Sequence, residues 1–331
     1  MKKIIVTGGA GYIGSHTAVK LYQAGFEPII IDNLSNSSKN NLEGINKIIG
    51  SKLKFYNADC TKINEISNIL NIEKKIVGII HFAAFKSVEE SVFDPKKYYD
   101  NNIGSLEVII RCMKKNKIPN IIFSSSCTVY GTPDHLPINE KSKFNTPTSP
   151  YAETKQICEN IINKNSFNSI TLRYFNPIGC HESYLIGDCS KDKPTNLVPI
   201  INEVAIGKRT EVIIFGNDYE TIDGTCVRDY INVTDLADSH VKALNFLIKN
   251  QGKHSFNIGT GKGTSVLELI RCFEEINNIK INITIGPRRK GDIGKIWADC
   301  SKSQKELSWI PTKNIEQSLK SAWMWEKMKN I

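Results

Sequence analysis

The chain has 331 residues, of which 40% are hydrophobic, 23% charged and 8% aromatic. This composition is that of an ordinary globular protein, and it excludes a disordered, collagenous or coiled-coil chain. The net charge of +9 comes from single and paired lysines spread along the sequence, so it predicts no nucleic-acid partner.

Short apolar runs alternate with longer helical patterns in the first half of the chain. The apolar runs predict strands at residues 3–7, 28–32, 53–57, 77–82, 120–124 and 169–173. The stretches between them predict helices at residues 12–24, 40–49, 63–70, 96–115 and 150–165. Strict alternation of strand and helix predicts an α/β fold with a Rossmann-type, doubly wound parallel sheet.

The second half is organised differently. After residue 175 the sequence is irregular and rich in Gly, Asn, Asp and Pro, which predicts a smaller α+β domain at residues 176–231 and 258–331. We expect residues 1–175 to form the larger domain and residues 232–257 to return to it. A cleft between two such domains is the place to look for a ligand.

A glycine-rich turn follows the first predicted strand. Gly8, Gly11 and Gly14 allow a tight turn, close approach to a pyrophosphate and helix–strand packing. Asp32 ends the second predicted strand, where a carboxylate binds ribose hydroxyls, and no Arg follows it to bind a 2′-phosphate. The pattern predicts an NAD site, because a plain turn does not explain Asp32.

A Tyr-x-x-x-Lys pair opens the predicted helix at 150–165. Tyr151 and Lys155 are four residues apart, so both side chains lie on one helix face, and Ser126 follows the fifth predicted strand. Tyrosine has a pKa of about 10 and acts as a base near neutral pH only beside a cation, which Lys155 supplies. We predict these three residues to be catalytic; the alternative is a buried Tyr and a surface Lys on an ordinary helix.

Together these features resemble the extended short-chain dehydrogenase/reductase family, whose members act on nucleotide sugars. More specific stretches, at residues 81–86, 98–102, 173–177, 215–219, 223–230 and 287–292, are similar to its UDP-glucose 4-epimerase branch. The resemblance implies interconversion of UDP-galactose and UDP-glucose through a 4-keto sugar with tightly held NAD, a reaction of galactose metabolism.

The resemblance also implies two sets of binding residues. Besides Gly8, Gly11, Gly14, Asp32, Ser126, Tyr151 and Lys155, it implies these NAD contacts: Tyr12, Ile13, Asn33, Leu34, Ser35, Asn36, Ser37, Asp59, Cys60, Phe82, Ala83, Ala84, Phe85, Lys86, Asn101 and Phe175. The contacts implied for the UDP-sugar are Asn176, Asn196, Leu197, Phe215, Arg228, Arg289, Asp292 and Ile296. Some of these residues could instead have purely structural roles, as helix caps, core side chains or members of surface ion pairs.

One of these positions does not decide whether the enzyme accepts N-acetylated sugars. Many of these epimerases carry Tyr where this chain has Ile296, and a small residue there accompanies acceptance of N-acetylated sugars. Ile is intermediate, so a UDP-N-acetylglucosamine 4-epimerase is an alternative. The family also implies a homodimer in which the helices at 96–115 and 150–165 pack against their copies.

Two other functions compete. A nucleotide-sugar 4,6-dehydratase needs an Asp-Glu acid pair where this chain has Cys127-Thr128, and an NAD-sensing protein has no need of Tyr151 and Lys155. We expect Cys127 to be a packing residue, because no His lies near it in the sequence. The six His form no zinc motif, so we predict no metal, and His81 to be a core residue.

The remaining features concern location. The nine Cys are scattered without a Cys-x-x-Cys pair, which predicts reduced, mostly buried thiols. The first residues contain no apolar core of a secretory signal, and the longest apolar stretch, residues 77–85, is too short to cross a bilayer. We therefore expect a cytosolic protein with no membrane partner.

Overall fold

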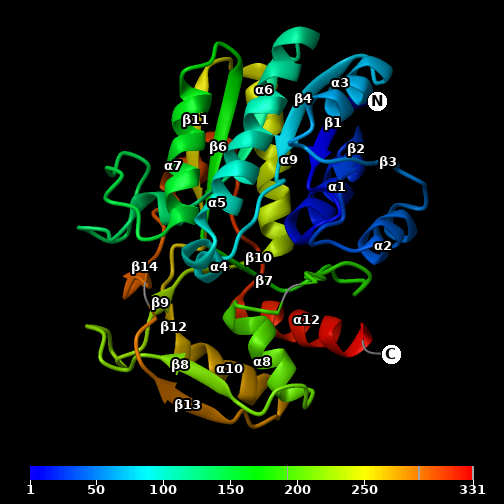
Figure 1. Ribbon diagram of the computed structural model, residues 1–331. Helices are drawn as coiled ribbons and strands as arrows, with labels where there is room; N and C mark the ends of the chain where they lie inside the picture. The colour runs from blue at the N-terminus through cyan, green and yellow to red at the C-terminus, as the bar shows by residue number, and fades with distance from the viewer. Residues whose placement is uncertain (192, 290, 330–331) are drawn as a thin grey trace.

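A seven-stranded parallel sheet forms the centre of the larger part of the molecule (Figure 1). The computed structural model describes residues 1–191, 193–289 and 291–329. The sheet has the order β11-β6-β5-β4-β1-β2-β3. Its strands are β1 (Lys2–Thr7), β2 (Phe26–Asp32), β3 (Lys54–Asn57), β4 (Ile76–His81), β5 (Asn120–Ser126), β6 (Asn168–Tyr174) and β11 (Lys253–Ile258). The predicted doubly wound α/β fold is confirmed.

Helices cover both faces of this sheet. One face carries α1 (Tyr12–Gln23), α2 (Lys39–Ile49) and α9 (Val233–Lys249). The other carries α3 (Ile63–Ile72), α6 (Gly104–Asn116) and α7 (Pro150–Asn163). In β1, Ile4 and Val6 enter the first layer and Ile5 the second, because successive side chains of a strand point to opposite faces. Burial on both faces explains the continuous apolar runs of the sequence.

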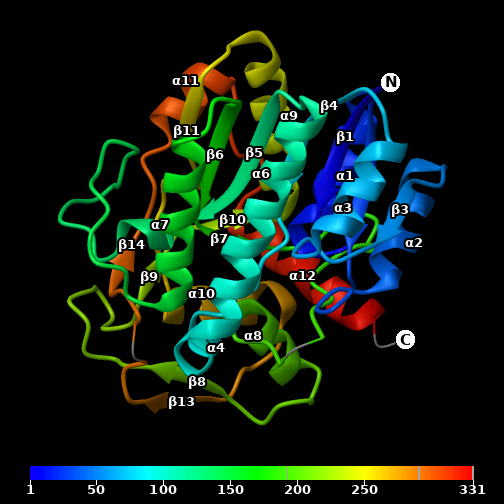
Figure 2. The same ribbon diagram turned by 45° about the horizontal axis from the view of Figure 1, so that its top comes forward.

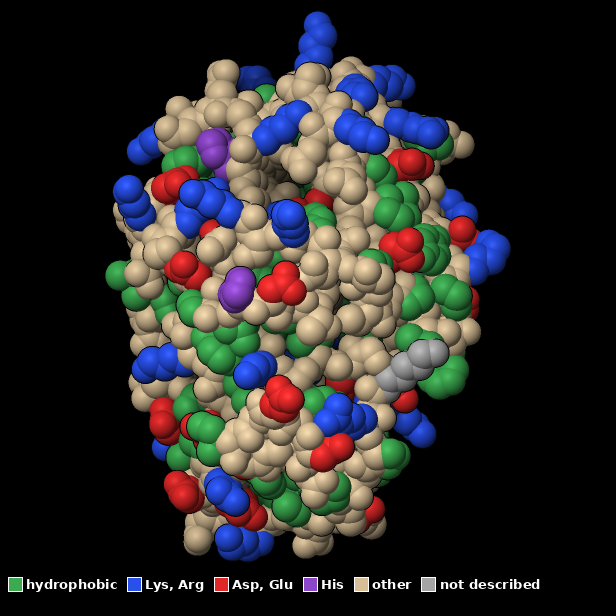
Figure 3. Space-filling model, turned by 90° about the vertical axis from the view of Figure 1, so that its left-hand side faces the viewer, with side chains coloured by type: hydrophobic (Ala, Val, Ile, Leu, Met, Phe, Trp, Pro, Cys, Tyr) green, Lys and Arg blue, Asp and Glu red, His purple; other side chains and the backbone are tan. Residues whose placement is uncertain are grey.

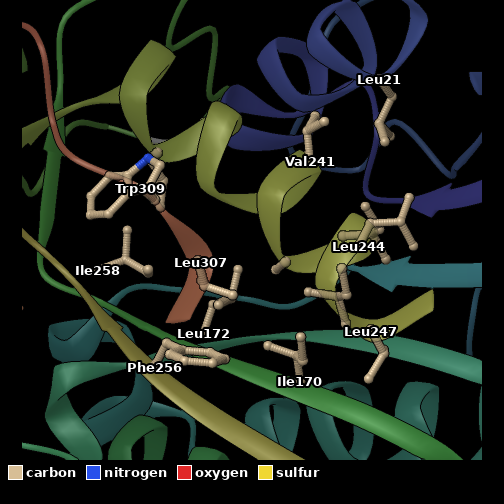
Figure 4. Close-up of a cluster of buried hydrophobic side chains, with 14 of the residues drawn as sticks. Leu21, Ile170, Leu172, Val241, Leu244, Leu247, Phe256, Ile258, Leu307 and Trp309 are labelled. Carbon is tan, nitrogen blue, oxygen red and sulfur yellow. The ribbon is translucent and has the colours of Figure 1, made fainter. Parts of the chain in front are cut away.

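Figure 4 shows the core on the α9 side of the sheet, where side chains of α9 meet those of β6 and β11. Leu244 and Leu247 of α9 lie near Ile170 of β6 and Phe256 of β11, and all four are inaccessible or almost so. Truncating a buried Leu to Ala costs about 2–5 kcal/mol. This core fixes α9 and the edge strand β11 against the sheet, although both come late in the chain.

The predicted helix at 96–115 is divided. A short α5 (Pro95–Tyr98) leads through a π-helical turn, η1 (Tyr99–Ile103), into α6, and α4 (Val88–Phe93), which we did not predict, precedes it. The π turn sets Asn102 against the segment after β4, where its side chain exchanges hydrogen bonds with the backbone of Phe85 at 2.8 and 3.1 Å. A single π turn inside a helix is common at functional sites.

Most of the remaining elements lie beyond the carboxyl ends of the large sheet; the exception is the helix at residues 301–307, which packs against β11 and α9 (Figure 2). Two small parallel pairs are β7 (Asn176–Ile178) with β10 (Tyr230–Asn232), and β8 (Val212–Phe215) with β13 (Ile283–Gly286). A three-stranded sheet joins β9 (Val227–Arg228), β12 (Thr264–Ser265) and β14 (Lys295–Ile296). The helices are α8 (Leu197–Ala205), α10 (Val266–Asn277), α11 (Ser301–Leu307) and α12 (Ile315–Met328), and η2 (Cys127–Tyr130) is a short 3-10 turn.

The lysines are less evenly spread in space than in the sequence. In Figure 3, Lys and Arg side chains are most frequent at the top, the end at which the strands of the large sheet begin. Exposed lysines near the C-terminal ends of three helices lie at this end: Lys114 and Lys115 on α6, Lys164 after α7 and Lys249 on α9. Cations are favourable there because the helix dipole is negative at its C-terminus. Within the described ranges, no helix is long and apolar enough to cross a membrane.

Candidate active site

A cavity of about 480 Å³ lies at the carboxyl ends of the central strands. Every predicted site residue lines it except Leu34, whose side chain is not among the lining groups. Parallel α/β sheets bind ligands at this edge, beside the point where the strand order reverses, which here lies between β1 and β4. Folding thus brings together residues that lie as far apart in the sequence as Gly8 and Ile296.

Two glycines of the turn between β1 and α1, Gly8 and Gly14, leave no room for a side chain. Gly8 has a φ of +67°, and a Cβ there would lie 2.8 Å from the backbone nitrogen of Ala83. A Cβ on Gly14 would lie 2.3 Å from the carbonyl oxygen of Gly8, so α1 packs against the turn only with glycine at this position. A Cβ on Gly11 meets only one nearby atom, at 3.1 Å, and this position lines the cavity. The cradle fits a pyrophosphate beside the first turn of α1.

Asp32 anchors the loop that follows β2. Its Oδ2 accepts a hydrogen bond from the Ala10 nitrogen at 3.0 Å, and its Oδ1 accepts from the Leu34 nitrogen and the Ser37 hydroxyl. The carboxylate therefore joins the glycine turn to the loop at residues 33–37, of which all but Leu34 line the cavity. Carboxylate, loop and glycine turn together fit the ribose and pyrophosphate of a dinucleotide.

The catalytic candidates lie deeper in the cavity. Ser149 caps the start of α7, since its hydroxyl accepts from the Ala152 nitrogen at 3.2 Å, and Pro150 takes the first helical position. The Lys155 Nζ donates to the carbonyl oxygen of Ser124 at 2.7 Å and lies 5.7 Å from the centre of the Tyr151 ring. Tyr151 and Lys155 thus share one face of α7 and meet the end of β5.

Burial shapes the ionisation of this pair. It raises the pKa of Tyr151 above its ordinary value, and an interaction with Ser126 opposes that rise. It lowers the pKa of Lys155 to about 8, against the influence of Cys158 and Glu159. Lys155 is therefore still mostly protonated near neutral pH, so its cation is available to stabilise a phenolate on Tyr151.

The neighbouring groups behave as inert partners. Burial raises the pKa of the Cys127 thiol to about 12, and Cys127 packs in an apolar cluster, so it is no nucleophile. His81 bonds Thr7 at 2.8 Å and Ser105 at 3.4 Å, and burial lowers its pKa to about 3. His81 is thus a hydrogen-bonded core residue, as we predicted. The described part of the chain contains no group of His, Cys, Asp and Glu able to hold a metal ion.

A pair of arginines lies at the far end of the cavity. Arg289 bonds the carboxylate of Asp292 at 2.9 Å, and Arg228 approaches the same carboxylate at 3.9 Å. The Arg289 guanidinium also lies 5.3 Å from the Phe215 ring. Both arginines are among the implied UDP-sugar contacts, and guanidinium groups suit forked recognition of a diphosphate. Asp292 holds both on one side of the cavity. Lys290, in the same predicted stretch, lies outside the described residues.

The sequence did not reveal a segment at residues 179–191 that closes the dinucleotide side of the cavity. The Tyr12 hydroxyl donates to the carbonyl oxygen of Gly179 at 2.5 Å, and Asp188 pairs with Lys86 at 3.4 Å. Lys191 donates to the carbonyl oxygen of Leu34 at 2.6 Å, so the backbone of the loop after β2 contacts this segment. No motif marks the segment, because its contacts join residues about 100 to 170 positions apart.

Comparisons with known proteins agree with this geometry. A family model described as GDP-mannose 4,6 dehydratase matches residues 5–322. A UDP-glucose 4-epimerase of Pasteurella multocida is 46% identical over 329 residues, which cover 98% of this chain and 97% of the relative. The crystal structure of UDP-glucose 4-epimerase from Bifidobacterium longum, in complex with NAD+ and UDP, has a TM-score of 0.96, 42% identity and 99% coverage of both chains. The enzyme of Stenotrophomonas maltophila, crystallised with NAD and formylated UDP-arabinopyranose, has a TM-score of 0.96 and 40% identity, covering 100% of this chain and 99% of the other.

Proposed function

Because the chain belongs to the UDP-glucose 4-epimerase family of extended short-chain dehydrogenases/reductases, we propose that it interconverts UDP-galactose and UDP-glucose with bound NAD. One observation carries the proposal. The Tyr151–Lys155 pair meets the end of β5 inside the same cavity that begins at the glycine turn. The cavity therefore combines a dinucleotide site with a proton-transfer site.

Three side chains carry the chemistry. Tyr151 takes the proton of the C4 hydroxyl and returns it after the sugar has turned, and Lys155 stabilises the phenolate in between. Ser126, which follows Ser125 at the end of β5, holds the reacting hydroxyl. The chemistry that NAD supplies when bound is reversible acceptance of a hydride from C4, so no net oxidation occurs.

The binding roles divide along the chain. Residues 1–175 with 232–257 form the NAD-binding part, and residues 176–231 with 258–331 bind the UDP-sugar. Arg228 and Arg289 hold the diphosphate, which anchors the substrate while leaving the hexose free to turn. The ion pairs of both arginines with Asp292 support this role, since they fix the guanidinium groups beside the cavity.

The sugar pocket decides between related substrates. Ile296 is 2% exposed and lines the cavity, so its side chain bounds the space for the hexose. The second candidate is epimerisation of UDP-N-acetylglucosamine, which Ile296 favours more than a Tyr at this position does. Dehydration is disfavoured because Cys127 and Thr128 line the cavity where a dehydratase needs two acids.

We extend the proposal to assembly and location. A homodimer formed by α6 and α7 is consistent with Val108 and Ile161 on these helices, which are only partly buried in the single chain. A cytosolic location is consistent with nine free cysteines, most of them buried. Light scattering of the purified protein tests the dimer.

The experiment that tests the function is a turnover assay without added cofactor. The purified protein receives UDP-galactose, and formation of UDP-glucose is followed; UDP-N-acetylgalactosamine is tested in parallel. We expect conversion of UDP-galactose and a loss of 10²-fold or more in the Tyr151→Phe variant. No conversion even after NAD is supplied, or near-normal turnover by both Tyr151→Phe and Lys155→Met, would refute the proposal.

A further inference from the structure

A buried carboxylate lies one helical turn beyond the catalytic lysine. Glu159 of α7 is 2% exposed, four residues after Lys155. Its Oε1 accepts a hydrogen bond from the Ser125 hydroxyl at 2.5 Å and from Arg173 Nε at 3.1 Å, and its Oε2 accepts from Arg173 Nη2 at 2.8 Å. A carboxylate is costly to bury, so this one must be tightly compensated.

The compensation comes from a closed network behind the cavity. Arg173 of β6 is 6% exposed, and its Nη1 donates to the Tyr130 hydroxyl at 2.9 Å. The guanidinium lies 5.1 Å from the Tyr130 ring and 4.8 Å from the Phe144 ring. The Tyr130 hydroxyl in turn donates to Asn257 of β11 at 2.6 Å. The network thus joins α7, the turn after β5, β6 and β11.

This network reaches the catalytic groups through β5. Ser125 lies between Ser124, whose carbonyl oxygen accepts from Lys155, and Ser126, the predicted catalytic serine. By holding the Ser125 hydroxyl, Glu159 fixes the end of β5. The two neighbours of Ser125 then supply the contact to Lys155 and the predicted catalytic hydroxyl. Glu159 and Arg173 are not among the residues that line the cavity, so they touch neither substrate nor cofactor.

Glu159 also lies on the same helix as Lys155, one turn later. Titratable groups from three elements surround Lys155. Tyr151, Cys158 and Glu159 lie on the same helix, and His81 lies on β4. On β6, Tyr174 and Arg173 adjoin these groups. Burial keeps His81 neutral, with a pKa of about 3, and raises the pKa of the Cys158 thiol to about 12. Cys158 and then Glu159 oppose the fall in the pKa of Lys155 that burial causes.

We propose that Glu159 is a positioning residue of the epimerase reaction: through Ser125 it fixes the end of β5, and with it the Ser124 carbonyl that binds Lys155 and the neighbouring Ser126. This inference rests on the proposed function. Arg173 has a supporting part, because it allows the carboxylate to stay charged inside the protein. Without it, Glu159 would be an uncompensated buried charge.

The test is the Glu159→Gln variant of the full chain with NAD bound. The amide keeps the volume but places an N–H donor where Glu159 has an acceptor, so the bonds from Ser125 and from both Arg173 nitrogens cannot all be made. We expect kcat for UDP-galactose to fall about 10-fold while KM changes less than about 2-fold, and the alkaline fall of kcat to begin about one pH unit lower. Unchanged kcat with an unmoved alkaline limb would overturn the proposal.

A second variant separates charge from packing. In Glu159→Gln the guanidinium of Arg173 loses its partner, so the single variant is expected to be less stable. The double variant Glu159→Leu/Arg173→Met removes both buried charges, restores a neutral interior and leaves Ser125 without its acceptor. We expect it to regain stability but keep the lowered kcat and the shifted alkaline limb; a return of the wild-type kcat and pH profile would show that only packing matters and would overturn the proposal.

A matched control and a direct readout complete the design. Asp235→Asn changes another buried carboxylate, which accepts from Thr312 and Lys313 and does not line the cavity, and it should lower stability without moving the pH profile. The phenolate of Tyr151 is read from the tyrosinate absorbance that the Tyr151→Phe substitution abolishes. It should appear at higher pH in Glu159→Gln, and an unchanged titration would count against the proposal. This readout needs no turnover, so it separates failure of the inference from failure of the proposed function.

Discussion

Glu73 stabilises the sheet from the end opposite the cavity. Its carboxylate, 1% exposed, pairs with Lys3 of β1 at 2.7 Å and Lys54 of β3 at 3.0 Å, and it accepts from the Tyr56 hydroxyl at 2.8 Å. Burial by itself would raise the pKa of Glu73, but the hydrogen bonds from Lys3, Lys54 and Tyr56 lower it to about 2. Glu73 thereby ties the first strand of the sheet to its edge strand.

The size of the effect follows from this pKa. A fall from 4.5 to about 2 corresponds to about 3 kcal/mol of stability at roughly 1.4 kcal/mol per pH unit. Lys54 is half exposed, and water screens its charge, so we expect Glu73→Gln to lower the free energy of unfolding by about 2 kcal/mol at pH 7. Because the folded pKa is depressed, this stability is present above pH 4.5 and is lost as the pH falls through 2.

The assay is urea unfolding of the wild type and the variant at pH 7 and pH 4. The difference between them should shrink by up to about 0.8 kcal/mol at pH 4, where the unfolded carboxyl is largely protonated. Glu27→Gln is the matched control, since Glu27 is 3.9 Å from Lys54 and a third exposed; we expect a loss below about 0.5 kcal/mol. A Glu73→Gln loss no larger than that of the control would refute the reasoning.

Four further experiments have defined outcomes. Gly14→Ala should lower stability by about 1–3 kcal/mol and abolish NAD retention, because its Cβ would meet the carbonyl of Gly8; Gly104→Ala, with open space at the Cβ, is the control in the same thermal melts. Lys86→Gln breaks the ion pair with Asp188, so more NAD should be lost on gel filtration than from the wild type. Ile296→Tyr should lower the rate with UDP-N-acetylgalactosamine relative to UDP-galactose about 10-fold or more, as measured by competition. In the wild type, kcat should fall as the pH rises past about 8, where Lys155 loses its proton; a flat profile to pH 10 would contradict that assignment.

Local sequence patterns determined most of the large sheet and of the helices that cover it. The apolar runs predicted all of the first six strands to within two residues, because both faces of each strand are buried and neither needs polar side chains. The cap Ser149 and Pro150 fixed the start of α7, and therefore the shared face of Tyr151 and Lys155. The family resemblance drawn from these motifs is confirmed by relatives that match almost the whole chain.

Only the tertiary structure decided how distant segments meet. The π turn before α6, the segment at residues 179–191 that closes the cavity, and the Glu159–Arg173 pair carry no periodic pattern, since their partners lie far away in the sequence. Leu34 shows the same limit: Lys191, 157 residues later, binds its carbonyl, and its side chain does not line the cavity. Sequence patterns report burial and local hydrogen bonds, whereas the contact that positions Lys155, with the Ser124 carbonyl, exists only once α7 packs against β5.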